Sequence, residues 1–286
     1  MKVWMIIAIC FIVAGLVICT IALVSLGFDF GNLSTQAMET NTYAPDGDFS
    51  NILVDVRTAD ITFKLSTDGR TKVVCYEDAE MKHKVEISDG ALLIINKDNG
   101  KWYQHIGIFT EETAVTVYLP AELFYDELNL YCTTGDITVA KDIRFLKANV
   151  ETTTGDIDWN ANTAGKLQIK CTTGDIAVSN VHCGSLDVQG TTGDVELKNT
   201  EAEDQLNVKV TTGDVELDRV DAAELNIKAT TGDVTGTLVS DKIFDTKAAT
   251  GMIVTPAGDV IKDTTKPLGK CTVETTTGDI KIEIEQ

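Results

Sequence analysis

Histidine and paired cysteines are scarce in this chain, and their scarcity argues against most kinds of active site. The only histidines are His83, His105 and His182, and they show no metal-ligand spacing. The sequence contains no C-x-x-C pair, no nucleophile elbow and no phosphate-binding glycine loop. We therefore predict no catalytic, cofactor-binding or metal-binding residues, and a protein that is not an enzyme.

Proline and positive charge are scarce as well. The chain has 286 residues with four prolines and 43% hydrophobic residues, which excludes a disordered polymer and allows a sizeable core. The formal net charge is −20. Such a surface repels nucleic acid and anionic lipid, so we expect neither as a partner. It could attract cations or basic partners, although acidic residues most often form a solvated surface.

Charge is absent from the segment between Val3 and Phe28. As a helix this segment would be about 39 Å long, enough to cross a bilayer core of about 30 Å. Lys2 precedes it and Asp29 follows it, so the positive-inside rule places the N-terminus in the cytoplasm and residues 29–286 outside. We predict a transmembrane anchor over residues 1–28 of a single-pass cell-membrane protein.

Two other kinds of leader fit this segment less well. The apolar region of a cleaved signal peptide has about 7–15 residues, and Ser25-Leu26-Gly27 is a weak cleavage site. A lipoprotein needs a small residue before its acylated cysteine, whereas isoleucine precedes both Cys10 and Cys19. Residues 29–50 show no sustained periodicity, and we predict that they form a tether.

An internal repeat dominates the rest of the chain. The motif Thr-Thr-Gly-Asp recurs with its glycine every 19 or 20 residues, and a degenerate copy, Thr250-Gly251-Met252, precedes the last full copy. The glycines of the full copies are Gly135, Gly155, Gly174, Gly193, Gly213, Gly232 and Gly278. The aspartates that follow them are Asp136, Asp156, Asp175, Asp194, Asp214, Asp233 and Asp279.

Apolar and polar residues alternate on both sides of each glycine, which is typical of strands with one buried face. In a β-hairpin, Thr-Gly would be the loop, and the favoured hairpin turns would force the β-branched threonine to positive φ. Thr-Gly instead suits a type II turn, which can act as a corner between strands. We therefore favour an all-β parallel solenoid with about 19–20 residues per coil over an antiparallel meander.

The ends of the array depart from the repeat. Ala257-Gly258-Asp259-Val260 also resembles the corner, so either Gly251 or Gly258 could be the corner of its coil. Thr58-Ala59-Asp60-Ile61 resembles a copy with alanine in place of glycine. We predict one extracytoplasmic β-repeat domain over residues 51–286, with an irregular capping part over 51–131 and the Thr-Thr-Gly-Asp repeats over 132–286.

The repeated copies, together with Val115-Thr116-Val117-Tyr118-Leu119-Pro120, resemble a bacterial family of unknown function with β-strand repeats whose members are called "putative adhesins". The resemblance covers roughly residues 50–286. It implies a β-repeat fold and a cell-envelope protein with an N-terminal anchor, and it implies no catalytic residues.

The repeated polar residues and the cysteines each have a structural and a functional interpretation. Stacked corner aspartates could form a cation ladder, for example for calcium, but we favour hydrogen bonds from each aspartate to the backbone of its own corner. Rows of threonine could bind a regular ligand such as a glycan, although threonine simply favours strands. Cys132 and Cys171 would lie two coils apart, too far for a disulfide, so we expect small core residues.

These observations predict a surface adhesion, binding or structural module whose partner is an envelope glycan or protein. One alternative is a sensor or regulator of the cell envelope that works through a membrane partner, because the cytoplasmic part is too short to signal alone. A polysaccharide-active enzyme fits less well, since carboxylate pairs arise by chance in so acidic a chain.

Overall fold

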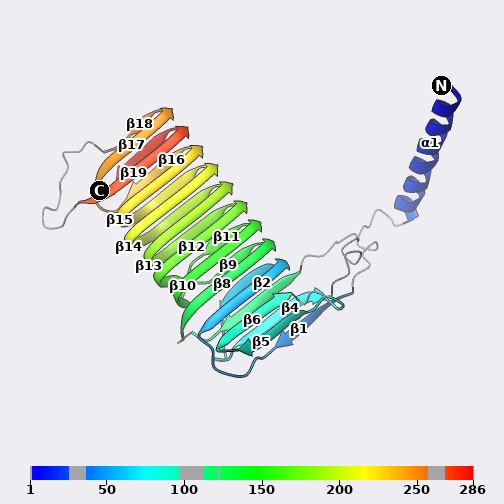
Figure 1. Cartoon of the computed structure of the whole chain (residues 1–286), viewed down its shortest axis with the longest axis horizontal. Helices are drawn as coiled ribbons and strands as arrows, with labels where there is room; N and C mark the ends of the chain where they lie inside the picture. Colours follow the sequence, from blue (N-terminus) through cyan, green and yellow to red (C-terminus); the bar gives the residue numbers. More distant parts are fainter. Residues whose placement is uncertain (1, 26–36, 97–112, 122, 257–267, 286) are drawn as a thin grey trace.

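The chain folds into one long β-solenoid. The computed structural model describes residues 2–25, 37–96, 113–121, 123–256 and 268–285. The described strands belong to a single 20-stranded sheet that winds into stacked coils (Figure 1). The all-β prediction and the choice of a parallel solenoid over a meander are confirmed.

Helix α1 covers Lys2–Ser25, within the segment predicted as a transmembrane anchor. Among the described residues, none of the helices combines the length and the apolar character that crossing a membrane requires. The predicted transmembrane helix is therefore not confirmed.

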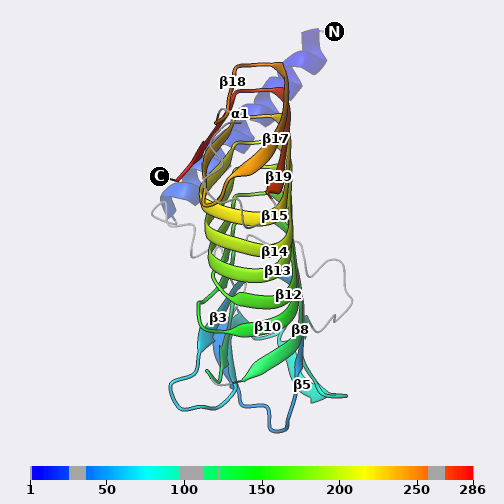
Figure 2. The same cartoon turned by 90° about the vertical axis from the view of Figure 1, so that its left-hand side faces the viewer.

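The middle of the solenoid consists of regular parallel coils, which Figure 2 shows stacked above one another. Leu167, Leu186, Leu206 and Leu225 are register partners in successive coils, which confirms the repeat of 19–20 residues. The strands are β8 (Phe124–Thr134), β9 (Ile137–Val139), β10 (Arg144–Thr154), β11 (Ile157–Trp159), β12 (Asn162–Thr173), β13 (Ile176–Thr192), β14 (Val195–Thr212) and β15 (Val215–Thr231).

The N-terminal end adds two more coils and an antiparallel cover. Strands β2 (Asn51–Thr58) and β3 (Asp60–Leu65) form a coil that pairs with β8 and β9, and Ala59 occupies its corner. Strands β6 (Ala91–Asn96) and β7 (Ala114–Leu119) form the coil beyond it. Strand β5 (His83–Ser88) pairs antiparallel with β6, and β4 (Lys72–Asp78) pairs antiparallel with β7. The capping part is therefore more regular than its sequence suggested.

Part of the predicted tether is a strand. Residues 26–36 lie outside the described residues, but β1 (Met38–Tyr43) pairs antiparallel with β4 along its whole length. The difference has a physical reason, because β4 would otherwise offer an open strand edge. Strand β1 covers that edge.

The C-terminal end does not follow the order of the chain. Its strands are β16 (Val234–Leu238), β17 (Lys242–Thr250), β18 (Ile253–Val254), β19 (Gly269–Thr277) and β20 (Ile280–Ile284). Strand β19 pairs with both β15 and β17, and β20 pairs with both β16 and β18. The last coil of the sequence is thus inserted beneath β17 and β18. Gly251 is a corner of this outermost coil, whereas Gly258 lies outside the described residues.

Inward-facing residues of every coil form one continuous core. An aromatic stack runs along it from Phe49 through Tyr125 and Phe145 to Trp159, with ring centroids 5.7–5.9 Å apart. Such ring pairs contribute about 0.5–1.5 kcal/mol each beyond their area burial. The buried Trp159 also donates its indole N–H to the carbonyl of Ala161 at 2.6 Å.

Candidate functional site

The repeated glycines form a column in which each corner touches the next. The seven glycines of the full copies have φ between +129° and +144°, a region that L side chains rarely adopt. A Cβ atom on Gly213 would lie 1.9 Å from the carbonyl oxygen of Gly193 in the neighbouring coil. Only glycine allows coils to stack this closely. Ala59, at the first corner, is not among the residues with positive φ.

The corner aspartates form a hydrogen-bonded ladder along this column. One oxygen, Oδ1, of each aspartate accepts the backbone N–H of the aspartate in the next coil, at 2.7–2.9 Å, and Oδ1 of the last, Asp279, accepts that of Met252. The ladder joins Asp60, Asp136, Asp156, Asp175, Asp194, Asp214, Asp233 and Asp279. The sequence led us to expect bonds within each corner, whereas these bonds join successive corners. These hydrogen bonds to the backbone give each aspartate a structural role. The repetition of aspartate at the corners therefore has an explanation that does not involve calcium.

Rows of polar side chains cover the outer face of the long strands. The threonines of the corner motif are exposed in every full copy. Further from the corner on the same strands lies what we call the amide row, which consists of Asn129, Asn149, Gln168, Asn207 and Asn226, with Asp187 between Gln168 and Asn207. Its members are half-buried, and Asn226 Nδ2 donates to Asn207 Oδ1 at 3.1 Å. This face offers hydrogen-bond donors and acceptors at the regular spacing of the coils.

The cysteines of the solenoid are free and buried. Burial raises the pKa of the Cys171 thiol to about 11 and that of Cys183 to about 12. Cys132 donates a weak hydrogen bond to the carbonyl of Ala59 at 3.5 Å. These thiols are poor nucleophiles near neutral pH, because the reactive form is the thiolate.

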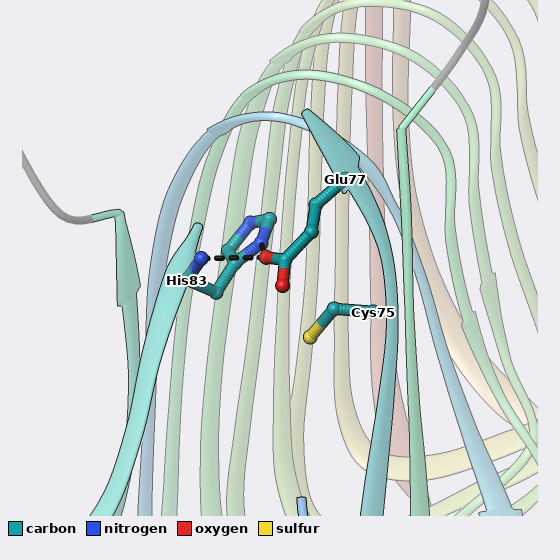
Figure 3. A group of neighbouring side chains, drawn as sticks. All are labelled: Cys75, Glu77 and His83. Carbon is teal, nitrogen blue, oxygen red and sulfur yellow. Dashed lines mark hydrogen bonds and ion pairs between the residues drawn. The ribbon is translucent and has the colours of Figure 1, made fainter. Parts of the chain in front are cut away.

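A second cluster of polar groups lies inside the N-terminal end, where the sequence analysis placed none. Cys75, Glu77 and His83 are buried, and a ligand atom from each lies within 4.8 Å of the other two. Figure 3 shows the Glu77 carboxylate between the His83 ring and the Cys75 sulfur. Desolvation, with a smaller contribution from Glu77, raises the pKa of Cys75 to about 12.

Hydrogen bonds hold Glu77 from several directions. Its Oε1 accepts from Asn41 Nδ2 at 2.8 Å and from the Tyr43 hydroxyl at 2.9 Å. Its Oε2 lies 2.6 Å from both the backbone nitrogen and Nδ1 of His83. Nε2 of His83, however, is buried and finds no hydrogen-bond partner among the described residues. The cluster is thus fixed in place with one polar atom unsatisfied.

The solenoid matches a known protein family. Residues 49–242, more than half of the chain, match the family described as Toastrack DUF4097. The chain belongs to the Toastrack DUF4097 family. The resemblance suggested by the Thr-Thr-Gly-Asp copies is confirmed. No curated protein matches the chain.

The solved structures that match this chain are distant in sequence. A protein from Bacteroides fragilis described as a "putative adhesin" is 17% identical, with a TM-score of 0.53 over 87% of this chain and 99% of its own. Two proteins from Parabacteroides distasonis cover 87% of this chain and 98% of their own. One is described as a "putative lipid binding protein" (15% identity, TM-score 0.48) and the other as a "putative adhesin" (12%, 0.41). At 17% identity, the likeness to the B. fragilis protein shows a shared fold.

The Toastrack solenoid has a second corner that the sequence analysis missed. Asn180, Asn199 and Arg219 adopt positive φ at equivalent places in successive coils, and Asn199 Nδ2 donates to Asn180 Oδ1 at 3.1 Å. The residue type varies there, so periodicity alone does not reveal the corner. The buried cluster had a weak signal: Val73, Cys75 and Glu77 alternate inward, which places a carboxylate at a core position.

A groove of about 760 Å³ lies near the C-terminal end of the Toastrack solenoid. Acidic residues, among them Glu201, Asp221 and Glu224, line much of it. Lys242 is buried at its base, where it donates to the carbonyl of Ala222 at 2.6 Å and pairs with Asp221. The ammonium group of Lys242 therefore has a structural role, because it holds the start of β17 against the neighbouring coil at the C-terminal end.

Proposed function

We propose that this Toastrack protein is a membrane-anchored, extracytoplasmic adhesion or binding module that contacts an envelope or host-surface glycan. The observation that carries the proposal is the outer face of the long strands. Exposed threonines repeat there in every full copy of the motif, and the amide row repeats in most coils with Asp187 as its one interruption, so a polymer with repeating hydroxyl groups could hydrogen-bond to successive coils. The role is non-catalytic. The B. fragilis protein of similar fold is described as a "putative adhesin", which agrees with an adhesion role.

The proposed attachment rests on the uncharged run from Val3 to Phe28. In this proposal the run holds the chain at the cell membrane and residues 29–286 face outward. We expect the full chain to remain with the membrane fraction after a high-salt wash, and a chain lacking residues 3–28 to leave it. Digestion of intact spheroplasts with an added protease should remove the solenoid. Protection of the solenoid in that experiment would overturn the proposed orientation.

Binding is tested with glycans and cell-wall fragments, measured by a saturable rise in the melting temperature of the full chain. Replacing Asn207 and Asn226 together with alanine removes two adjacent members of the amide row. Each hydrogen bond contributes about 0.5–1.5 kcal/mol, so we expect affinity to fall about 10-fold while the unliganded protein still folds.

The matched control replaces Glu196 and Glu216 with glutamine. These residues are exposed and are register partners at the start of β14 and β15, directly after the corners and more than nine residues before the amide row in each strand. Their replacement should leave affinity within a factor of two. Equal losses in both double variants would rule out the amide row as the contact, and no binding to any glycan would favour a scaffold role.

A further inference from the structure

The cluster inside the N-terminal end has the composition of a metal site. We propose that Cys75, Glu77 and His83 bind one divalent transition-metal ion of the zinc class. Thiolate, imidazole and carboxylate groups are the ligands that zinc takes in proteins, and three such ligands leave a fourth position for water. All three come from one short stretch of chain, because Cys75 and Glu77 share the inner face of β4 and His83 opens β5.

The present geometry is close to that of a tetrahedral site. Bond lengths of about 2.0–2.3 Å place tetrahedral ligand atoms roughly 3.3–3.8 Å apart. The ligand atoms of the cluster lie within 4.8 Å of one another, and His83 Nδ1 lies 2.6 Å from Glu77 Oε2. Binding therefore requires shifts of about 1 Å, in which the sulfur moves inward and the imidazole separates from the carboxylate.

Surrounding groups already hold the carboxylate in position. Asn41 and Tyr43 donate to Oε1, and the backbone N–H of His83 donates to Oε2. Such outer contacts orient metal-binding carboxylates in other proteins.

The protons balance simply. The neutral His83 ring carries one proton, and a metal bound at Nδ1 requires that proton to be on Nε2, so the imidazole releases no proton to solvent. The thiol proton of Cys75 passes to solvent, so the bound state has one thiolate, one carboxylate and one neutral imidazole. Entry is through β1, an edge strand that contributes Asn41 and Tyr43 and whose residues are exposed or half-buried.

The test uses the full chain, purified in a mild detergent and stripped with a chelator. Zinc is titrated by calorimetry, and cobalt replaces zinc to give an absorption band specific to cobalt–thiolate bonding. We expect one zinc per chain, a rise in melting temperature of about 5 °C and a cobalt–thiolate band. Cys75→Val keeps an apolar side chain of similar size in the core, and should lower zinc affinity more than about 100-fold and abolish the band.

Three further variants separate this site from other zinc ligands. Tyr43→Phe removes one outer contact of Glu77 and should lower affinity about 10-fold. Cys183→Val removes a buried thiol elsewhere and should change nothing. His182→Gln removes an exposed imidazole that lies 3.2 Å from Glu203, the rival surface site, and should also change nothing. Unchanged affinity in Cys75→Val, or no stoichiometric zinc in the parent protein, would overturn the proposal.

Discussion

Replacing Gly213 with alanine is expected to lower the free energy of unfolding by about 4 kcal/mol or more. Two costs combine at this corner. The backbone holds φ at +143°, where an L residue is strained, and the new Cβ would lie 1.9 Å from the carbonyl oxygen of Gly193. Because that oxygen belongs to the main chain of the next coil, relief requires two coils to separate. Thermal unfolding should show a melting temperature lower by roughly 8–16 °C, and valine should do more damage than alanine.

The same substitution at Gly190 provides the control. Gly190 lies in β13, two residues before the end of the same kind of strand, and its φ is not in the left-handed region. A Cβ there would meet Val210 Cγ2 at 3.7 Å, an ordinary contact. We expect Gly190→Ala to be neutral or to stabilise the fold by about 0.5–1 kcal/mol. Equal melting temperatures for the two alanine variants would show that close stacking is not the reason for glycine at the corner.

The features that could be predicted from the sequence are the structural requirements that recur in every coil. Glycine at the corner and apolar residues on either side meet the same constraint in each coil, so their spacing predicts the coil length. The aspartate also recurs because each coil presents the same backbone N–H to the aspartate of its neighbour, as Asp214 does to the carboxylate of Asp194. The repetition in the sequence indicates that each corner requires glycine and aspartate. It does not indicate that the aspartate accepts a hydrogen bond from the next coil.

Features that occur once could not be predicted in this way. The order of the last coils depends on pairing between segments far apart in the chain, and the glycine spacing from Gly232 to Gly251 fits a sequential array equally well. Strand β1 follows from an open edge that exists only after β4 has folded. The cluster around Glu77 forms because the turn after β4 brings His83 back to it, a contact that no spacing rule describes.

The glycine column and the aspartate ladder at the corner limit which residues could determine binding specificity. The glycine column and the aspartate ladder both hold one coil against the next, so the glycine backbone and the aspartate side chains have little freedom to adapt to a ligand. The outer rows are different, because equivalent positions hold Glu151, Lys170 and Gln189 in successive coils. We therefore assign the specificity of the proposed glycan binding to the outer face, whose residues vary without disturbing the core.

Replacing Val273 with aspartate is expected to lower the free energy of unfolding by about 3–5 kcal/mol. Val273 is fully buried in β19, between the coil of β15 and the coil of β17. A carboxylate there would lose its hydration and gain no partner, so the inserted coil should detach together with the strands it holds. Hydrogen exchange should then quicken over both β17 and β19, and the melting temperature should fall by roughly 6–20 °C.

Thr246→Asp tests the coil order directly, because Thr246 is the register partner of Val273 and occupies the same place before its corner glycine. In the observed order, Thr246 belongs to the outermost coil and is half-buried, so a carboxylate can turn toward water and should cost about 1 kcal/mol or less. In a sequential array, Thr246 would instead lie between two coils and Val273 would lie at the end. Greater damage from Thr246→Asp than from Val273→Asp would therefore contradict the insertion of β19 beneath β17.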